Sequence, residues 1–475
     1  MTKARIIATV GPASQSPEIL AELLLQGVDV FRLNFSHGNH EWHGLMIDEI
    51  RNQSRQIGRP VAILQDLQGI KIRTGSVEPD PVVLLTGQSL QLTTESVLGD
   101  AEQVSISYPD LPNDVSAGDE ILLSDGQIQL RVVATTRTSI ECSVLSGGRL
   151  VSNQGVNVPG VSVSAPPLTE KDRADLLFGI RKDVDYIALS FVQNANDVSE
   201  LRAFLDQVDA DIPIIAKLEK PSSIENLEGI LERADGVMVA RGDLGVEMSP
   251  EKVPMIQKRV IAEANRCGKL VITATQMLES MIRSPRPTRA EASDVANAVL
   301  DGTDAVMLSG ETATGKYPVD AVRMMSKIVA QAETYDVVSP YFEQVDDLSF
   351  PQTICISAYH ASRAIAAKGI VAFTQSGSTA RMISKYRPPV QIWGITPHTR
   401  IARRLMLYPG VQTVLMREIG NVDELITELE DVLIERGLVE PGDKLVILTG
   451  APILERGNTN LMKLHTVRAR EKETE

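Results

Sequence analysis

The chain has few cysteines, no long apolar run and no excess of basic residues. Cys142, Cys267 and Cys355 are far apart, so they form neither a disulfide framework nor a metal-ligand cluster, and they indicate a reducing, cytoplasmic location. No segment has the length of a membrane span, and the first residues lack the apolar core of a signal peptide, so we expect no membrane contact. The net charge of −15 argues against a nucleic-acid partner, because such partners favour a basic face.

What the chain does have is a long alternation of strand and helix patterns. Three strands are predicted before residue 73, and five more between residues 167 and 340. Eight strands in about 250 residues are the number and length of a (β/α)8 barrel. The predicted strands are Arg5–Val10, Val28–Phe35, Val61–Leu67, Tyr186–Phe191, Pro213–Glu219, Asp235–Arg241, Leu270–Met277 and Ala305–Glu311.

Residues 74–166 interrupt this barrel after its third strand. Their short alternating runs, separated by glycine turns, predict an inserted small β-barrel domain. Because insertions of this length are usually functional, we expect a mobile lid. The acidic stretch 338–350 is typical of a linker. The fold class is therefore α/β, with a catalytic barrel (1–73 and 167–340), a lid (74–166) and a C-terminal regulatory α/β domain (350–475).

The stretch 213–247 carries the densest pattern of charge. Lys217 and Glu219 alternate onto one face at the end of a predicted strand, and Arg241 and Asp243 are expected to do the same on the next. The C-terminal strand ends of such a barrel are where its chemistry takes place. Two carboxylates with an open side suit Mg2+, so we expect a metal and anion site. Ion pairs in solvent are the plainer alternative.

The other predicted strand ends are rich in phosphate-binding side chains. They show no Ser-His-Asp arrangement and no glycine-rich dinucleotide loop. This pattern favours phosphoryl transfer, in which positioning and charge neutralisation do most of the catalysis. A Mg2+-dependent lyase or aldolase and a non-catalytic metabolite sensor remain as alternatives. The candidate phosphate binders are Arg32, Arg73, Lys171, Lys217 and Arg241.

Seven short runs are highly specific as a set: ATVGPAS (8–14), FRLNFSHG (31–38), AKLE (216–219), VARGDLGVE (239–247), ATQMLESM (274–281), PTRAE (287–291) and MLSGETATGKYP (307–318). With these runs the chain resembles the pyruvate kinase family over nearly its whole length. The resemblance implies transfer of the phosphoryl group of phosphoenolpyruvate to ADP, followed by protonation of the enolate. It also implies the three-domain architecture described above.

The resemblance further implies roles for individual residues. Glu219 and Asp243 match the ligands of a catalytic Mg2+ (or Mn2+), and Lys217 matches the lysine that stabilises the transferring phosphoryl group. The implied catalytic residues are Lys217, Arg32, Thr275 and Ser309, and the implied substrate-binding residues are Arg32, Lys217, Gly242, Asp243 and Thr275. The implied nucleotide-binding residues are Thr9, Pro12, Asn34, His37, Arg73 and Lys171.

One departure concerns the K+ that many members of the family need. Asn34, Ser36 and Asp66 of its site remain, but Leu67 stands at the threonine position and Lys71 at the glutamate position. Because the Lys71 ammonium can supply the positive charge itself, we expect that K+ is not required. The plainer alternative is that Lys71 points to solvent.

The C-terminal domain carries a Ser-Gly-Ser-Thr turn that opens a helix. A helix N-terminus with free N–H groups suits a phosphate, and in the family this position binds an allosteric effector. We therefore expect a sugar phosphate or nucleotide as activator; a structural helix cap is the alternative. The loop Ala451–Gly457 leaves its identity open, and the family suggests a homotetramer. The expected effector-binding residues are Thr374, Ser376, Ser378 and Thr379.

Overall fold

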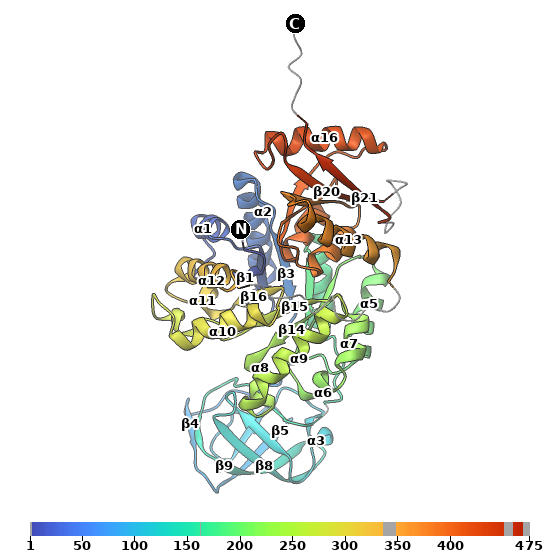
Figure 1. The fold of residues 1–475 in the computed structure, drawn as a ribbon. Coiled ribbons are helices and arrows are strands. Elements are labelled where there is room, and N and C mark those ends of the chain that lie inside the picture. Colours follow the sequence, from blue (N-terminus) through green and yellow to red (C-terminus); the bar gives the residue numbers. More distant parts are fainter. Residues whose placement is uncertain (1, 162, 336–347, 451–458, 469–475) are drawn as a thin grey trace.

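Figure 1 shows the computed structural model of the chain, which describes residues 2–161, 163–335, 348–450 and 459–468. The predicted linker therefore lies mostly outside the described residues, and the loop Ala451–Gly457 lies wholly outside them. No described helix is both long and apolar enough to cross a lipid bilayer.

Eight strands form the centre of the molecule: β1 (Arg5–Thr9), β2 (Val30–Asn34), β3 (Ala62–Asp66), β12 (Tyr186–Leu189), β13 (Ile214–Leu218), β14 (Gly236–Ala240), β15 (Leu270–Ala274) and β16 (Ala305–Leu308). They are all parallel and close into a barrel in the order β1-β16-β15-β14-β13-β12-β3-β2. The predicted barrel is confirmed. Its strands are apolar runs because side chains fill the inside and helices cover the outside, so both faces are buried.

The barrel helices begin at local signals that the sequence contains. Ser16 caps the first helix by accepting from the backbone N–H of Ile19, and Asn39 caps the second through Trp42. Gly58 ends the second helix with a φ of 72°, which favours glycine. The helices are α1 (Pro17–Leu25), α2 (His40–Ile57), α4 (Glu170–Arg181), α5 (Ala195–Gln207), α6 (Pro221–Glu225), α7 (Leu227–Arg233), α8 (Arg241–Glu247), α9 (Val253–Arg266), α10 (Arg289–Leu300), α11 (Gly310–Ala313) and α12 (Pro318–Ala332).

A β-rich domain, which we call the lid, lies between β3 and α4 in the sequence and at the lower end of the molecule in Figure 1. Its elements are β4 (Val82–Leu84), β5 (Ser89–Thr93), β6 (Gln103–Ser105), α3 (Leu111–Asp114), β7 (Glu120–Leu123), β8 (Ile128–Thr135), β9 (Ser139–Ser146), β10 (Gly148–Leu150) and β11 (Val156–Asn157). Its strands form a six-stranded sheet, β11-β7-β8-β9-β5-β6, and a two-stranded sheet, β10-β4, around one apolar core.

The C-terminal domain lies at the opposite end of the barrel from the lid (Figure 1). Its elements are α13 (Phe350–Ala364), β17 (Gly369–Phe373), α14 (Ser378–Lys385), β18 (Gln391–Thr396), α15 (Thr399–Arg404), β19 (Val411–Leu415), α16 (Val422–Glu435), β20 (Lys444–Thr449) and β21 (Leu461–Thr466). The sheet order is β19-β18-β17-β20-β21. The sequence predicts four strands in this domain, and β17, β18, β19 and β20 lie at these places to within two residues: Ile370–Gln375, Val390–Ile395, Val411–Met416 and Lys444–Leu448. Strand β21, which pairs antiparallel with β20, was not predicted.

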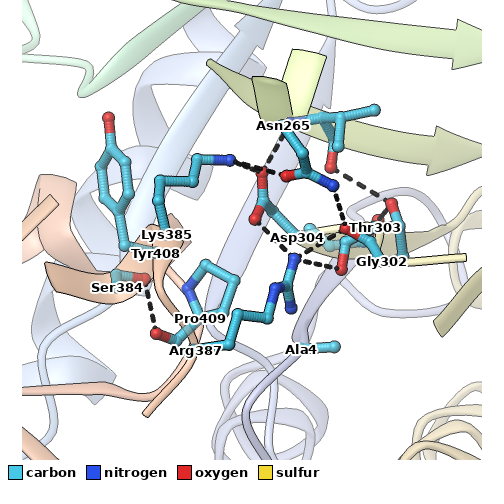
Figure 2. A network of polar contacts seen from close by, with 12 residues as sticks. Ala4, Asn265, Gly302, Thr303, Asp304, Ser384, Lys385, Arg387, Tyr408 and Pro409 are labelled. Atoms are coloured by element: carbon cyan, nitrogen blue, oxygen red, sulfur yellow. Dashed lines mark hydrogen bonds and ion pairs between the residues drawn. The ribbon is translucent and has the colours of Figure 1, made fainter. Parts of the chain in front are cut away.

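Asp304, buried just before β16, joins the C-terminal domain to the barrel (Figure 2). Its carboxylate accepts from Lys385 Nζ, from Arg387 Nη2 (2.9 Å) and from the backbone N–H of Val271 (2.8 Å). Lys385 Nζ also donates to Asn265 Oδ1 (3.3 Å). Burial lowers the pKa of Lys385, and the charge of Asp304 acts in the opposite direction. The buried charges are matched and hydrogen-bonded, which is the condition under which such a pair is retained.

Arg5 of β1 makes a second link between these domains. Its Nε donates to the carbonyl of Tyr408 (2.8 Å), its Nη2 donates to the carbonyl of Val411, and its Nη1 pairs with Asp29 (3.3 Å). The Arg5 side chain is 4% exposed, so these bonds form inside the domain interface. The C-terminal domain therefore covers one end of the barrel, and the lid lies at the other end.

Candidate active site

Four side chains meet at the C-terminal ends of β3, β12 and β13. Lys217 Nζ donates to Ser190 Oγ (2.8 Å) and pairs with Asp66 Oδ1 (3.2 Å) and Glu219 Oε1 (3.0 Å). All four residues are buried. Lys217 and Glu219 lie on the same face at the end of β13, as their spacing predicts. We call these four residues the catalytic cluster.

The charges in this cluster shift one another. Burial would lower the pKa of Lys217, but Asp66 and Glu219 outweigh burial and raise it. Burial would raise the pKa of Asp66, but Lys217 and Arg32, whose Nε lies 2.6 Å from Asp66 Oδ2, lower it. Burial raises the pKa of Glu219, and the charge of Asp243 adds to this rise against the effect of Lys217. A cation between Glu219 and Asp243 would offset both the burial of Glu219 and the repulsion between the two carboxylates. Glu219 and Asp243 therefore fit a divalent metal.

Thr9, on β1, supports Arg32 on the adjacent strand β2. Arg32 Nη1 donates to Thr9 Oγ1 (3.0 Å), and that hydroxyl donates to the carbonyl of Leu308 (2.9 Å). The structure thus places Thr9 behind the Arg32 guanidinium. Its hydroxyl orients Arg32, a phosphate-binding candidate, and is held by the carbonyl of Leu308 on β16.

Arg241 and Asp243 do not continue a strand, and the prediction that they share a strand face is wrong. Strand β14 ends at Ala240, and both residues lie in the first turn of α8. Arg241 Nη1 pairs with Asp294 (2.7 Å) and its Nη2 donates to the carbonyl of Thr275 (2.8 Å), so its charge is directed into the barrel wall. Asp243 faces the crevice between barrel and lid instead.

Thr275 and Ser309 follow β15 and β16 at the same end of the barrel. Thr275 has a φ of 69°, which is uncommon for a residue other than glycine. Its Oγ1 accepts from the backbone N–H of Gly242 (2.7 Å) and donates to the carbonyl of Ala274 (2.6 Å). Ser309 Oγ is buried and has no hydrogen-bond partner within the described residues. Strain and an unpaired buried hydroxyl are both features that occur at functional sites.

Several candidate nucleotide-binding residues lie around the turn between β2 and α2. Asn34 Oδ1 accepts from the backbone N–H of Ser36 (3.1 Å), and His37 is exposed. Lys171, at the start of α4, donates to a backbone carbonyl of this turn (2.7 Å) and pairs with Asp175 (2.6 Å). The structure thus brings the Asn34, Ser36 and His37 turn together with Lys171.

Pro12 and Arg73 lie apart from the catalytic cluster. Pro12 is exposed in the turn after β1. Arg73 Nη1 donates to the carbonyl of Asn153 in the lid (3.0 Å). A role for Arg73 at a phosphate therefore needs the lid and the barrel mouth to approach each other.

Lys71 lies at the lid side of the crevice that Asp243 and Glu247 also line. A Cβ atom placed on Gly155 of the lid would lie 3.7 Å from Lys71 Cε. Within the described residues, no hydrogen bond joins Lys71 Nζ to Asn34, Ser36 or Asp66. The Asp66 carboxylate is instead occupied by Arg32 and Lys217.

Two residues of the site received no role from the sequence. Ser190 lies near the end of the predicted strand Tyr186–Phe191, but its contact with Lys217 joins it to a residue 27 positions away on another strand. Asp175 also accepts from His40 Nε2 (2.7 Å), in addition to Lys171. It follows Lys171 by four residues, so the helical spacing of opposite charges could have identified it.

The effector candidates lie at the N-terminus of α14, on one wall of a pocket in the C-terminal domain. Thr374 Oγ1 accepts from the backbone N–H of Gly377 (2.8 Å), whose φ is 88°. Ser376 Oγ donates to Ser378 Oγ (3.2 Å), and Thr379 Oγ1 bonds the Thr459 hydroxyl (2.6 Å). Three of the four candidates line the pocket, namely Thr374, Ser378 and Thr379.

Comparison with known proteins decides which family has this arrangement. A family model described as "Pyruvate kinase, barrel domain" matches residues 1–322, and one described as "Pyruvate kinase, alpha/beta domain" matches residues 352–465. The chain belongs to the pyruvate kinase family. As a member of the pyruvate kinase family it is a phosphotransferase.

Individual pyruvate kinases resemble the chain over nearly its whole length. A pyruvate kinase of Geobacillus stearothermophilus is 48% identical over 472 residues, which cover 98% of this chain and 80% of the relative. One of Staphylococcus aureus (strain MRSA252) is 46% identical over 98% of this chain and 81% of its own length. A crystal structure of a pyruvate kinase from Cryptosporidium parvum superposes with a TM-score of 0.93 at 40% identity, covering 98% of this chain and 96% of that one.

Proposed function

We infer that the chain transfers the phosphoryl group of phosphoenolpyruvate to ADP, giving pyruvate and ATP, as the last step of glycolysis in the cytoplasm. Membership in the pyruvate kinase family supports this reaction. The single structural observation that carries it is the cluster of Lys217, Glu219 and Asp66 at the barrel mouth. A buried ammonium held by two carboxylates is placed to neutralise charge on a phosphoryl group in transfer.

The side chains divide the work as follows. Glu219 and Asp243 would hold Mg2+ (or Mn2+), which neutralises the charge of phosphoryl and carboxylate oxygens when bound. Lys217 and Arg32 stabilise the transferring phosphoryl group. The backbone of Gly242 and Asp243, with the Thr275 hydroxyl, positions the substrate carboxylate. Thr275 and Ser309 lie on the path of the proton to the enolate, and the unpaired Ser309 hydroxyl supports that assignment.

The lid and the barrel mouth bind the nucleotide between them. The proposed contacts come from Asn34, His37 and Lys171 on the barrel and from Arg73, the last barrel residue before the lid. Thr9 acts through Arg32, and Pro12 forms the outer edge of the site. The proposed domain limits are 1–73 and 167–340 for the barrel, 74–166 for the lid and 350–475 for the C-terminal domain.

The enzyme is proposed not to require K+, because the Lys71 ammonium would supply the positive charge that K+ supplies at the remnant of the cation site formed by Asn34, Ser36 and Asp66. The test is pyruvate formation at saturating substrates with Mg2+, without K+ and then with K+ added. Equal activity in both supports the role of Lys71. A many-fold rise in activity on adding K+ contradicts the role of Lys71 but not the proposed reaction.

The C-terminal pocket is proposed to bind an activating sugar phosphate or nucleotide through Thr374, Ser376, Ser378 and Thr379. The assembly is proposed to be a homotetramer. Sigmoidal dependence on phosphoenolpyruvate that becomes hyperbolic with a metabolite phosphate supports this pocket. If no metabolite phosphate changes the half-saturation for phosphoenolpyruvate, the proposal fails.

The decisive experiment for the reaction is a coupled assay of pyruvate release from phosphoenolpyruvate with and without ADP. Release that needs ADP supports the kinase. Release without ADP favours a Mg2+-dependent lyase, and no release, even with candidate sugar phosphates, favours a non-catalytic sensor.

A further inference from the structure

Two segments of chain carry the lid. An exit segment, residues 67–73, leaves the end of β3, and a return segment, residues 166–169, leads into α4. The two are about a hundred residues apart in the sequence, yet they meet at one side chain. That side chain is Asp172, in the first turn of α4.

The Asp172 carboxylate accepts hydrogen bonds from both segments. Its Oδ1 accepts from the backbone N–H of Gly69 in the exit segment (3.1 Å). Its Oδ2 accepts from the backbone N–H of Thr169 (3.0 Å) and from the Thr169 hydroxyl (2.6 Å) in the return segment. Asp172 is 0% exposed, so water does not compete for these bonds.

Part of this arrangement is an ordinary helix cap. Thr169 Oγ1 accepts from the backbone N–H of Asp172, which completes a capping box at the start of α4. A capping box does not need the bond to Gly69, however, because that residue belongs to another part of the chain. The Gly69 contact is therefore an addition to the cap.

The exit segment is shaped to reach Asp172. Gly69 has a φ of +62°, and a Cβ atom there would lie 3.0 Å from Ser190 Cβ and 3.1 Å from Phe191 Cδ2. Glycine is thus required both by the backbone conformation and by the close approach to the residues after β12. The exit segment is pressed against the catalytic end of the barrel at the point where Asp172 holds it.

The same segment is bonded to the catalytic cluster. Ser190 Oγ donates to the carbonyl of Leu67 (2.7 Å) and accepts from Lys217 Nζ (2.8 Å). A continuous series of contacts therefore runs from Lys217 through Ser190 and residues 67–69 to Asp172.

Other contacts between the lid and the barrel lie away from these segments. Asn157 Nδ2 donates to Glu247 Oε1 (2.8 Å), and Gln193 Nε2 donates to the carbonyl of Val163 (3.1 Å). These bonds join the lid to the barrel and have to break when the lid moves away. The Asp172 bonds join the two carrying segments to each other at α4.

We propose that Asp172 is a positioning residue for phosphoryl transfer, because its carboxylate holds the exit and return segments together so that the lid closes to one defined position over the catalytic cluster. The proposal rests on the lid closing during the proposed reaction. It goes beyond the assignment of the reacting groups, since the bonds of the Asp172 carboxylate go to Gly69 and Thr169, which are neither proposed substrate-binding residues nor proposed metal ligands.

The matched substitution is Asp172→Glu. Glutamate is the usual residue at this position of a capping box, so the helix start is retained. The extra methylene moves the carboxylate away from its place beside Gly69. Asp172→Ala removes both contacts, and Thr169→Val removes the return contact of the hydroxyl. Gln352→Ala is the control, because Gln352 completes the capping box of α13 in the C-terminal domain, remote from the lid.

The lid position is measured as a distance between two spin labels. One is attached to the exposed Cys267 on the barrel, and the other to a cysteine introduced by Val133→Cys in the lid, where Val133 is 52% exposed. Cys142 and Cys355 are buried, so the label does not reach these two thiols in the folded enzyme, and burial also raises the pKa of both to about 12.

In the unsubstituted enzyme, phosphoenolpyruvate with Mg2+ should shift the label distance to a narrow distribution. In Asp172→Glu the distribution should stay broad, and kcat/KM for ADP should fall roughly ten- to hundredfold, the cost of misplacing reacting groups by about 1 Å. The midpoint of thermal unfolding should fall by no more than about 2–4 °C, the effect of a single lost contact. Gln352→Ala should change neither the distribution nor kcat/KM.

A failure of the role proposed for Asp172 can be distinguished from an absence of lid closure. If the label distance in Asp172→Glu is as narrowly distributed as in the enzyme with Asp172, and kcat/KM stays within twofold, Asp172 has no positioning role. If the labels of the unsubstituted enzyme do not move with phosphoenolpyruvate, the lid does not close and the role falls with it. Should Asp172→Ala not fold, Asp172→Glu still decides the question, because it retains the capping box of α4.

Discussion

Lys217 Nζ lies 3.0 Å from Glu219 Oε1, at the end of one strand and inside a cluster that excludes most water. The ammonium is thus held by a proposed metal ligand, and its raised pKa keeps it charged throughout the physiological range. Its charge and its position are fixed before any substrate arrives, which is the condition for strong electrostatic stabilisation of a transition state.

Lys217→Met should therefore lower kcat by at least ~10³-fold, several kcal/mol of transition-state stabilisation. Steady-state rates of pyruvate formation at saturating substrates measure this. Ser190→Ala, which removes a hydrogen bond to Lys217 but leaves its charge, should lose much less. A loss under tenfold in Lys217→Met would mean that its role is misassigned.

Asp175→Asn should raise KM for ADP roughly tenfold, equivalent to one hydrogen bond between charged groups, with kcat within twofold. The reason is that Asp175, 4% exposed, fixes Lys171 at the proposed nucleotide site. Asp48→Asn is the control, because Asp48 pairs with Lys182 beyond the other end of α4 and is 65% exposed. An equal effect of both substitutions would contradict a positioning role for Asp175.

Asp304→Asn should destabilise the interface between the barrel and the C-terminal domain by about 3–5 kcal/mol, because Lys385 is left buried without its counter-charge. Urea unfolding followed by a C-terminal domain probe measures the loss. Lys258→Met, which breaks a pair in which Lys258 is 49% exposed, should cost no more than about 1 kcal/mol. Comparable losses of stability in the two variants would show that the buried pair contributes no more than an exposed one.

Asp183 should make the same interface sensitive to acid. Burial would raise the pKa of Asp183, but Arg403 and Arg400 outweigh it and lower the pKa below its usual 3.8. A lowered folded-state pKa gives stability that is complete above the unfolded-state pKa and is lost as pH falls towards the folded-state value. Between pH 5 and pH 3, the urea midpoint should therefore fall less in Asp183→Asn than in the unsubstituted chain. An identical fall in both would contradict this linkage.

The sequence was sufficient where the signal was local. Strand β13 is apolar up to Lys217, and the alternation of its side chains places Lys217 and Glu219 on one face. Caps at Ser16 and Asn39 fixed the helix starts, because a side chain there needs only a backbone N–H three residues away. The barrel, and the site at its C-terminal end, follow from such local patterns.

What the sequence missed depends on distant partners. The sequence suggests Arg241 as a phosphate binder, but its guanidinium pairs with Asp294, 53 residues further on. The spacing of Arg241 and Asp243 fits a strand or a helix, and the chain turns into α8. The bond from Gly69 to Asp172 spans 103 residues, and nothing near either residue announces it. Strand β21 has only a weak alternation and forms because β20 offers an edge.

The position of Arg5 has a consequence for protein synthesis. Strand β1 leaves the ribosome long before β16, with which it pairs, and long before Tyr408 and Val411, whose carbonyls Arg5 binds. At the usual elongation rates, on the order of 20–80 s separate the two ends of this interaction. Until residues 305–308 appear, the nascent barrel has an open edge at β1, and until residues 408–411 appear, Arg5 lacks the two carbonyls and can pair only with Asp29. A nascent chain stalled before residue 305 should therefore need a chaperone to protect that edge, and one released after residue 411 should not.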